Sequence, residues 1–260
     1  MKPPLTYYGG KQQLSKLIVS LIPKHTLYCE PFFGGGAIFF AKEPSQVEVI
    51  NDTNGEVVNF YRVLKVNFAE LTEQVKATLH SRHQHNRALV IYKHPDLFTD
   101  VHRAWAVWVL AHQGFSSKLN GTWGYDRTEN KTTKQVHNKK SSFTENFSKR
   151  LEQAQIECAD ALKVIQTRDS EDSFFYCDPP YFNSHKGHYK NYNVDDFEKL
   201  LMLLSCIKGK FLLSSYPSPL LEKYIKRNKW FAKTVSMPFS VGTTKTKGIK
   251  REVLTANYPL

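Results

Sequence analysis

The sequence predicts an α/β fold with a parallel sheet and a separate module inserted into it. Short apolar strands alternate with helices between residues 11 and 66, which is the pattern of parallel strands joined by helical crossovers. The alternation resumes near residue 147. Residues 80–150 lack it and contain a long stretch rich in Gly, Asn, Ser, Thr and Lys, so we expect the inserted module there.

The elements of the first part follow from the spacing of apolar residues and from turn residues. Five apolar residues between positions 14 and 22 recur at helical intervals, and Pro23 ends that helix. Three consecutive glycines follow the first short strand and require a loop. In order, we expect helix 11–22, strand 26–29, glycine loop 34–36, helix 37–42, strand 47–50 and helix 56–66.

The elements of the second part are read in the same way. One strongly apolar stretch within residues 80–150 predicts a helix, and the polar segment after it predicts a long loop or hairpin. In order, we expect helix 103–112, loop or hairpin 116–142, helix 147–155, strand 174–177, helix 195–207 and strand 210–214. The expected division is therefore a domain of residues 1–79 and 151–260, with residues 80–150 inserted.

Positive charge is concentrated in two blocks of the chain. The 260 residues include 36 Lys and Arg against 24 Asp and Glu, a net charge of +12. Residues 80–150 hold twelve basic and five acidic residues, and residues 223–260 hold nine basic residues and one acid. A solvated lysine-rich face would explain either block alone. Two blocks on either side of an acidic segment favour a nucleic-acid partner.

Other features narrow the class of protein. No apolar run approaches the roughly 20 residues of a membrane-spanning helix, and the first residues lack the apolar core of a signal peptide. The four cysteines have no CxxC spacing, which argues against a zinc site or a disulfide framework. We therefore expect a globular protein of the cytoplasm, bacterial or of the host cell if a phage encodes it.

The glycine loop is the first feature with chemical meaning. It follows a strand that ends at Glu30, and Asp52 comes directly after the next strand. Glycines allow a ligand to approach the backbone closely, and α/β nucleotide sites place an acid at the end of the second strand to bind ribose hydroxyls. A ribose-bearing cofactor is one interpretation. A tight turn with a helix-capping Asp is the other, and the two remain open on these residues alone.

The second feature is the sequence Asp178-Pro179-Pro180-Tyr181, which directly follows an apolar strand. Two prolines remove two backbone donors and hold Asp178 in an extended conformation. The loop therefore presents a carboxylate, free carbonyl groups and an aromatic ring, which together suit a planar amine. Asp178 and the Pro179 carbonyl can each accept one hydrogen of an exocyclic amino group, and Tyr181 can stack on its ring.

Together these motifs resemble the Dam-type family of DNA adenine N6-methyltransferases, in which the cofactor motif precedes the target-recognition region. The resemblance covers nearly the whole chain and rests on four segments: Tyr7-Tyr8-Gly9-Gly10-Lys11, Glu30-Pro31-Phe32 with Gly34 and Gly36, Asp178-Pro179-Pro180-Tyr181, and Arg251-Glu252-Val253-Leu254. It implies a Rossmann-like methyltransferase sheet with helices on both faces, plus an inserted, mainly helical or hairpin DNA-recognition module.

The resemblance also implies roles for individual residues. The expected cofactor is S-adenosylmethionine, and the implied contacts to it are Tyr7, Lys11, Glu30, Phe32, Gly34, Gly36, Asp52, Asp160 and Asp178. Asp178, Pro179, Pro180 and Tyr181 would form the catalytic tetrad that holds an adenine flipped out of duplex DNA. Direct transfer of the methyl group to nitrogen would follow, without a covalent enzyme intermediate.

The recognition region departs from the family pattern. Relatives that methylate GATC carry a characteristic hairpin, and residues 114–125 do not match it well. The target sequence therefore stays open, with Lys118, Asn120 and Arg127 as candidate DNA contacts. His80, His83 and His85 lack an accompanying Cys or carboxylate pattern, so we expect no metal site.

Partners and alternatives follow from the same resemblance. The expected partners are double-stranded DNA and, in a restriction–modification system, a cognate endonuclease, with the protein a monomer or weak dimer. The tetrad alone does not exclude the same chemistry on an RNA adenine or on cytosine N4. A catalytically silent nucleic-acid-binding module is the alternative from a different class.

Overall fold

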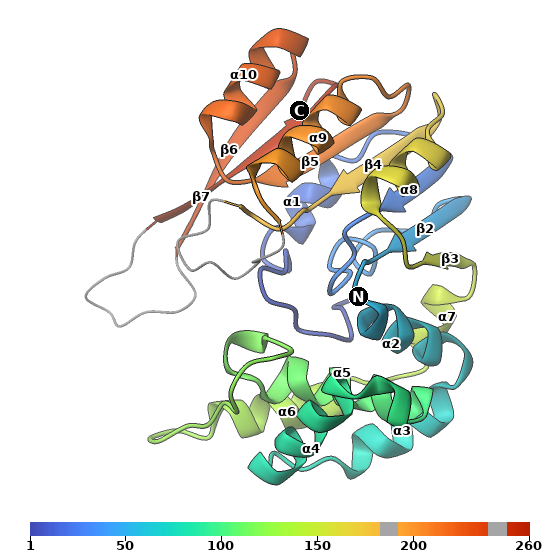
Figure 1. Ribbon diagram of the computed structural model, residues 1–260, viewed down its shortest axis with the longest axis vertical. Helices are drawn as coiled ribbons and strands as arrows, with labels where there is room; N and C mark the ends of the chain where they lie inside the picture. Colours follow the sequence, from blue (N-terminus) through green and yellow to red (C-terminus); the bar gives the residue numbers. More distant parts are fainter. Residues whose placement is uncertain (183–191, 239–248) are drawn as a thin grey trace. The chain divides into compact units, whose positions relative to one another are not determined.

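The computed structural model describes residues 1–182, 192–238 and 249–260. The described strands form a seven-stranded sheet in the order β3-β2-β1-β4-β5-β7-β6 (Figure 1). The strands are β1 (Leu27–Glu30), β2 (Val47–Asn51), β3 (Ala154–Glu157), β4 (Ser173–Cys177), β5 (Lys210–Ser215), β6 (Phe231–Pro238) and β7 (Ile249–Ala256). The predicted α/β sheet is confirmed.

By compactness the chain divides into two units, and each is described by itself. Unit 1 comprises Met1–Ser20, Phe33–Pro44 and Ile50–Ala159, and unit 2 comprises Leu21–Phe32, Ser45–Val49 and Asp160–Leu260. The expected functional boundaries at residues 79 and 151 remain a prediction, because compactness says nothing about which surface carries which function.

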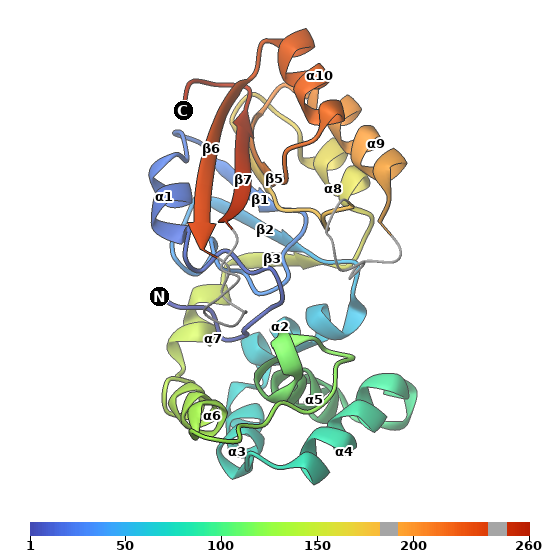
Figure 2. The same ribbon diagram turned by 90° about the vertical axis from the view of Figure 1, so that its left-hand side faces the viewer.

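Unit 2 contains the centre of the sheet and the helices that follow its strands. β4 is parallel to both β1 and β5, whereas β7 is antiparallel to β5 and β6. All five residues of β4 are buried, as expected for a central strand of a parallel sheet covered on both faces. Helices α8 (Ala161–Arg168), α9 (Val194–Leu204) and α10 (Pro219–Asn228) lie together along one side of these strands (Figures 1 and 2).

The helices of unit 2 begin at good capping residues. Asn193 starts α9 with a reciprocal capping box to Asp196, and Ser218 caps α10, whose first residue is Pro219. Such side chains satisfy the free N–H groups at a helix start. One face of α9 buries Phe197, Leu200, Leu201 and Leu204.

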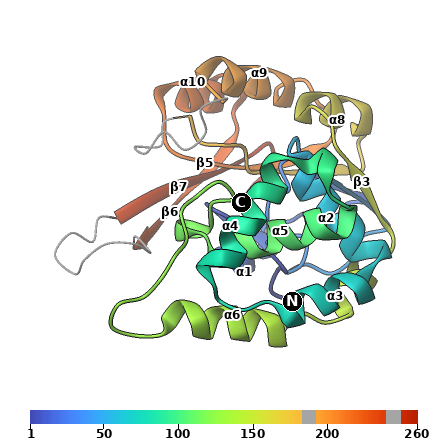
Figure 3. The same ribbon diagram turned by 60° about the horizontal axis from the view of Figure 1, so that its bottom comes forward.

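Unit 1 is mainly helical. Its helices are α1 (Ser15–Ser20), α2 (Gly55–Val66), α3 (Phe68–Ala77), α4 (Arg82–Lys93), α5 (Asp100–Gln113), α6 (Lys131–Ser141) and α7 (Asn146–Leu151), with short 3-10 turns η1 (Pro95–Leu97) and η2 (Phe115–Ser117). Helix α5 packs against α2, α3, α4 and α6, and Figure 3 shows it between α2 and α4. It is apolar around most of its circumference, and its buried residues include Trp105 and Trp108, so it forms the core of this bundle.

Two sequence predictions in unit 1 are wrong. Residues 37–42 form a turn rather than a helix, with Phe40 N–H donating to Gly36 O and Lys42 N–H to Ile38 O, both at 3.0 Å. The segment is too short to propagate a helix, since Pro44 follows it closely. The end of the predicted helix 147–155 is strand β3, because α7 stops at Leu151.

The expected loop at 116–142 is ordered in two parts. An isolated bridge joins Gly114 to Trp123, which closes a hairpin-like loop, and residues 131–141 form helix α6. The sequence missed α6 because it is polar nearly all round and buries only Val136. The other elements without a sequence prediction are α3, α4, η1, α8, α10 and β6.

No helix of the described chain is long and apolar enough to cross a membrane. The basic block at residues 223–260 is described only in part, because residues 239–248 lie outside the described residues.

Candidate active site

Two neighbouring strands of unit 2 end beside each other with acids. β1 ends at Glu30, and Asp178 directly follows β4. The two strands are parallel, with Cys29 opposite Phe175, so both acids come at the same edge of the sheet. Carboxyl ends of parallel strands are the usual position of ligand sites in α/β sheets.

Glu30 is a buried carboxylate with a specific donor. Only 2% of the residue is exposed, and the Tyr28 hydroxyl donates to its Oε1 at 2.5 Å. Burial, followed by the charge of Glu30, raises the pKa of Tyr28 well above its usual value. Tyr28 therefore stays a phenol that stabilises the carboxylate.

The tetrad loop is held by hydrogen bonds of Tyr181. Its hydroxyl donates to Asp178 Oδ1 at 3.1 Å and lies 3.1 Å from Ser214 Oγ on β5. Burial raises the pKa of Tyr181 well above the usual value, and the charges of Asp178 and Glu252 add to the effect. The Tyr181 ring packs edge-on against Tyr216, with centroids 4.4 Å apart.

A closely packed, mostly aromatic cluster adjoins the tetrad in unit 2. It consists of Pro180, Tyr181, Phe182, Phe197, Ser215 and Tyr216. Aromatic rings of this kind can pack against a planar base. Tyr216 is absent from the residues that the sequence singled out, and only the nearness of β5 to β4 reveals it.

In unit 1 the glycine loop has the backbone conformation that its sequence predicts. Gly34 and Gly36 have φ values of 48° and 66°, in the left-handed region that favours glycine. A Cβ on Gly36 would lie 2.5 Å from the Phe33 ring, and one on Gly34 would lie 3.0 Å from the Tyr7 ring. Tyr7, from the N-terminal motif, therefore packs on the loop.

Asp52 is tied to the same loop. Its Oδ2 accepts from Gly34 N–H at 2.8 Å and its Oδ1 from Asn54 N–H at 2.9 Å. Burial raises the pKa of Asp52, and these two hydrogen bonds oppose that shift. Each carboxylate oxygen keeps a second lone pair, so this bonding is compatible with accepting hydroxyl donors.

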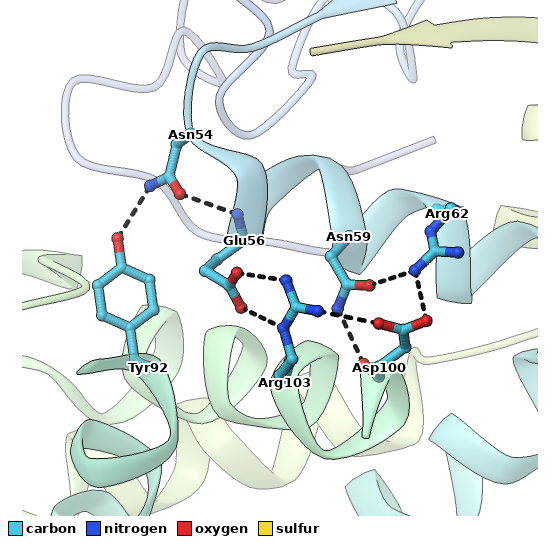
Figure 4. A network of polar contacts seen from close by, with 7 residues as sticks. All are labelled: Asn54, Glu56, Asn59, Arg62, Tyr92, Asp100 and Arg103. Carbon is cyan, nitrogen blue, oxygen red and sulfur yellow. Dashed lines mark hydrogen bonds and ion pairs between the residues drawn. The ribbon is translucent and has the colours of Figure 1, made fainter. Parts of the chain in front are cut away.

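Asn54 continues the network from Asp52 into the helical bundle (Figure 4). Its Oδ1 caps the start of α2, and its Nδ2 donates to the Tyr92 hydroxyl on α4 at 2.9 Å. Two residues further on, Glu56 accepts two hydrogen bonds from Arg103 on α5, at 2.6 and 3.0 Å. The loop that carries Asp52 is thus fixed by polar contacts to two helices of the bundle.

The other predicted cofactor residues lie as follows. Lys11 is buried and donates to Gly9 O at 3.2 Å. Phe32 packs edge-on against Tyr192, with centroids 6.5 Å apart. Asp160 is exposed and caps helix α8 by accepting from the N–H groups of residues 162 and 163. Helix capping alone therefore accounts for an Asp at this position.

A reciprocal amide contact in unit 1 was not predicted. The Asn51 side chain donates to Ala159 O at 3.0 Å and accepts from Ala159 N–H at 2.9 Å. This pair fixes the residue before Asp160 at the end of β2. In the sequence, the signal for this contact is the position of Asn51 at the end of a buried strand.

The predicted DNA contacts lie on or near the hairpin-like loop. Asn120 and Arg127 are exposed, and Lys118 places its ammonium 5.5 Å from the centre of the Tyr8 ring. Arg127 bonds the Tyr125 hydroxyl and lowers its pKa. The hairpin-like loop is thus in contact with the N-terminal aromatic motif through Tyr8 and Lys118.

Beside these residues lies an aromatic stack that the sequence did not reveal. Trp123 and Tyr125 are stacked with centroids 5.5 Å apart, and the Arg82 guanidinium lies 4.8 Å from the Trp123 ring. Tyr125 is 50% exposed. Cationic and aromatic groups together suit bases and phosphates.

The three neighbouring histidines have different surroundings. His80 bonds Thr133 and the Gly124 carbonyl, His83 is exposed, and His85 is fully buried. Across the described part of the chain, no group of three or more His, Cys, Asp or Glu residues has a geometry suited to a metal ion.

Comparison with known families decides the class of protein. The family described as D12 class N6 adenine-specific DNA methyltransferase matches residues 7–233. The chain belongs to this family. The match spans both the glycine motif and the Asp178–Tyr181 motif, so the predicted DNA adenine methyltransferase with a methyltransferase-type sheet is confirmed.

Relatives of this methyltransferase carry matching names. It is 28% identical to the type II methyltransferase M1.LlaDCHI of Lactococcus lactis subsp. cremoris, over 99% of this chain and 96% of the relative. It is 24% identical to the DNA adenine methylase of Escherichia coli K12, over 86% and 84% of the two chains. Among solved structures, a putative RNA methyltransferase, PH1948 from Pyrococcus horikoshii, aligns with a TM-score of 0.39 and 8% identity over 94% of this chain and 80% of that one.

Proposed function

We propose that this methyltransferase uses S-adenosylmethionine to methylate N6 of an adenine flipped out of double-stranded DNA. The observation that carries the proposal is the tetrad at the end of β4, where Asp178 is held by Tyr181 next to a cluster of aromatic side chains. A carboxylate in this position accepts a hydrogen of an exocyclic amino group, and rings around it hold the base.

The chemistry of the side chains fits this methyl donor. S-Adenosylmethionine has ammonium and sulfonium charges and two ribose hydroxyls, and it supplies an electrophilic methyl carbon when bound. Glu30 and Asp178 are acids at one edge of the sheet of unit 2, and Asp52 has free lone pairs for hydroxyl donors. We assign contacts to Tyr7, Lys11, Glu30, Phe32, Gly34, Gly36, Asp52, Asp160 and Asp178.

The tetrad's own part in the reaction is to orient the amino group. Asp178 and the Pro179 carbonyl each accept one N6 hydrogen, which reduces conjugation of the nitrogen with the ring and directs its lone pair at the methyl carbon. Pro180 keeps the loop rigid. Alignment of this kind is a large source of rate enhancement in direct transfers.

We assign target recognition to residues 80–150. Lys118, Asn120 and Arg127 are the proposed DNA contacts, and the stack of Arg82, Trp123 and Tyr125 adds a cationic and aromatic surface beside them. Relatives named type II methyltransferases suggest a restriction–modification system with a cognate endonuclease. We propose that the enzyme acts on DNA as a monomer or weak dimer.

The test is incubation of the purified protein with unmethylated genomic DNA and S-adenosylmethionine. Nucleoside mass spectrometry identifies the product, and single-molecule sequencing maps the modified positions. N6-methyladenine in one short motif is the expected result. Methylated cytosine, or methylation of RNA only, would overturn the assignment of the substrate, and DNA binding without any modification would indicate a silent module.

A further inference from the structure

The catalytic tetrad is joined to a buried acid of β7 that its sequence motif does not include. Tyr181 Oη lies 3.1 Å from both Asp178 Oδ1 and Ser214 Oγ, and Ser214 Oγ lies 3.2 Å from Glu252 Oε2. Four oxygens thus form a chain with three contacts. All four residues belong to unit 2.

The inner half of this chain is fully buried. Ser214 and Glu252 are both 0% exposed, and they come from adjacent antiparallel strands, with Ser215 opposite Val253. An acid in the middle of a sheet is rare, because removing its charge from water is costly unless specific partners stabilise it. Leu or Val would fill the site without that cost, so packing alone does not explain Glu252.

The two hydroxyl groups of the chain have one hydrogen fewer than its three contacts can hold. Three oxygen–oxygen contacts need three hydrogens, one in each. The hydroxyls of Tyr181 and Ser214 carry one hydrogen each and supply two, so the third has to come from another group. Other partners of the four groups do not change this count, because it concerns only hydrogens that lie between these oxygens.

We propose that Asp178, Tyr181, Ser214 and Glu252 form one hydrogen-bonded chain that receives the proton released by the target amino group. Asp178 is the member that touches substrate, and Ser214 and Glu252 are positioning residues that act through Tyr181. The proposal rests on the proposed function, because it needs an amino group at Asp178.

The step balances as follows. The amino nitrogen forms a bond to the methyl carbon, and the bond from that carbon to sulfur breaks with its electron pair left on sulfur. The nitrogen then has four bonds and a positive charge, and it releases a proton to Asp178. The new hydrogen on Asp178 then bonds Tyr181 Oη, the Tyr181 hydroxyl turns to donate to Ser214 Oγ, and the Ser214 hydroxyl continues to donate to Glu252 Oε2. Each of the three contacts then holds one hydrogen.

Two substitutions test the chain at different points. Ser214→Ala removes the central link, while Glu252→Gln keeps the size and hydrogen-bonding ability of the side chain. A Gln amide can donate to Ser214 Oγ, and the Ser214 hydroxyl can then donate to Tyr181. All three contacts then hold a hydrogen before the reaction, so the chain can no longer accept one. If Glu252 only supported the sheet, Glu252→Gln would retain the rate; as part of the proton chain, it loses rate as Ser214→Ala does.

Thr255→Val provides the matched control. Thr255 lies on β7, is 0% exposed, and its hydroxyl has no hydrogen-bond partner among the described residues. Valine has the same shape, so this variant removes a buried hydroxyl without touching the chain. Thermal denaturation of all three variants reports any loss of folding.

The measurements are single-turnover methyl transfer to unmethylated DNA, the KM for DNA and the Kd for S-adenosylmethionine. We expect the transfer rate to fall about 10- to 100-fold in Ser214→Ala and Glu252→Gln, toward the lower range for positioned proton transfer, with KM and Kd unchanged. Thr255→Val should stay within about twofold of the natural protein, because residues 252 and 255 of a strand face opposite sides of the sheet.

Different failures are distinguishable. Glu252→Gln with a normal rate overturns the proton chain, and so does an equal loss in Thr255→Val, which would indicate general sensitivity of the core. If Ser214→Ala does not fold, the methyl-transfer rate of Glu252→Gln alone tests the proton chain. Absence of transfer by the natural protein overturns the proposed function together with the chain.

Discussion

At the scale of single residues, Asp178 is the group on which the proposed chemistry depends. Replacement by Ala removes the acceptor for the amino hydrogen and the partner of Tyr181. We expect methyl transfer to be abolished, with a loss of at least about 100-fold, while affinity for DNA stays near normal. Tritium transfer and a gel-shift titration on the same preparation measure the two effects, and near-normal turnover would contradict the mechanism.

Gly36 supplies a residue-level prediction about stability. A Cβ there would lie 2.5 Å from Phe33, which is itself buried among Phe39, Phe40 and Tyr61, and the backbone has positive φ. We expect Gly36→Ala to lower the free energy of unfolding by about 1–3 kcal/mol.

Gly55 is the matched control for that change. It begins α2, and a Cβ there would meet nothing within 4 Å. Gly55→Ala should be neutral or stabilising by a few tenths of a kcal/mol. Urea denaturation of both variants checks the contrast, and equal effects would show that the glycine loop is not sterically demanding.

At the scale of elements, an ion pair between Glu56 and Arg103 joins α2 to α5. Arg103 and Glu56 make two hydrogen bonds, and their side chains are 24% and 12% exposed. The pairing with Glu56 raises the pKa of Arg103. We expect a double-mutant cycle of Arg103→Met and Glu56→Gln to give a coupling energy of about 1–3 kcal/mol.

A second ion pair in the same network serves for comparison. Arg62 and Asp100 are 55% and 45% exposed, so solvent screens their attraction. A cycle of Arg62→Met with Asp100→Asn should give less than about 1 kcal/mol. A larger coupling at the exposed pair than at the buried one would contradict this ranking.

Helix α5 also predicts a pH dependence. Burial and the nearby charge of Lys139 lower the pKa of His112 to about 3, and its Nδ1 bonds the Trp108 carbonyl at 2.7 Å. The unfolded chain binds a proton near pH 6.5 and the folded chain does not, so stability falls as the pH drops below that value. The slope from this residue is at most about 1.4 kcal/mol per pH unit.

His112→Gln tests that dependence. The amide can still donate to the Trp108 carbonyl but does not titrate. We expect a flatter profile of unfolding free energy between pH 6.5 and 4 than in the natural protein. Burial also lowers the pKa of His85, so some slope should remain, and an unchanged profile would exclude His112 as a contributor.

At the scale of the whole molecule, the excess of 12 positive charges predicts electrostatic binding to DNA. Each phosphate neutralised by Lys or Arg releases counterions, so affinity should fall steeply and log-linearly with salt. We expect substitution of Lys118 and Arg127 by Gln to reduce that slope by about one for each cation replaced. Fluorescence anisotropy across a salt series measures it, and a salt-independent affinity would contradict the basic surface.

Predictability differed between local and long-range features. The tetrad and the glycine loop are contiguous in sequence, and their prolines and glycines restrict the backbone directly, so both could be found from the sequence. Helix α6 was missed because its polar surface carries no periodic signal. Tyr216, Ser214 and Glu252 were missed as site residues because strand pairing brings them to the tetrad.

The sequence by itself determined the class of fold and the family, and it located the Asp178–Tyr181 motif, because each depends on short motifs whose residue types have a local physical reason. Only the tertiary structure decided what surrounds them. It joined Ser214 and Glu252, 38 positions apart, by a hydrogen bond and connected both to Asp178 through Tyr181. Hydrogen bonds act over about 3 Å in space, and the chain order does not record which distant strands come that close.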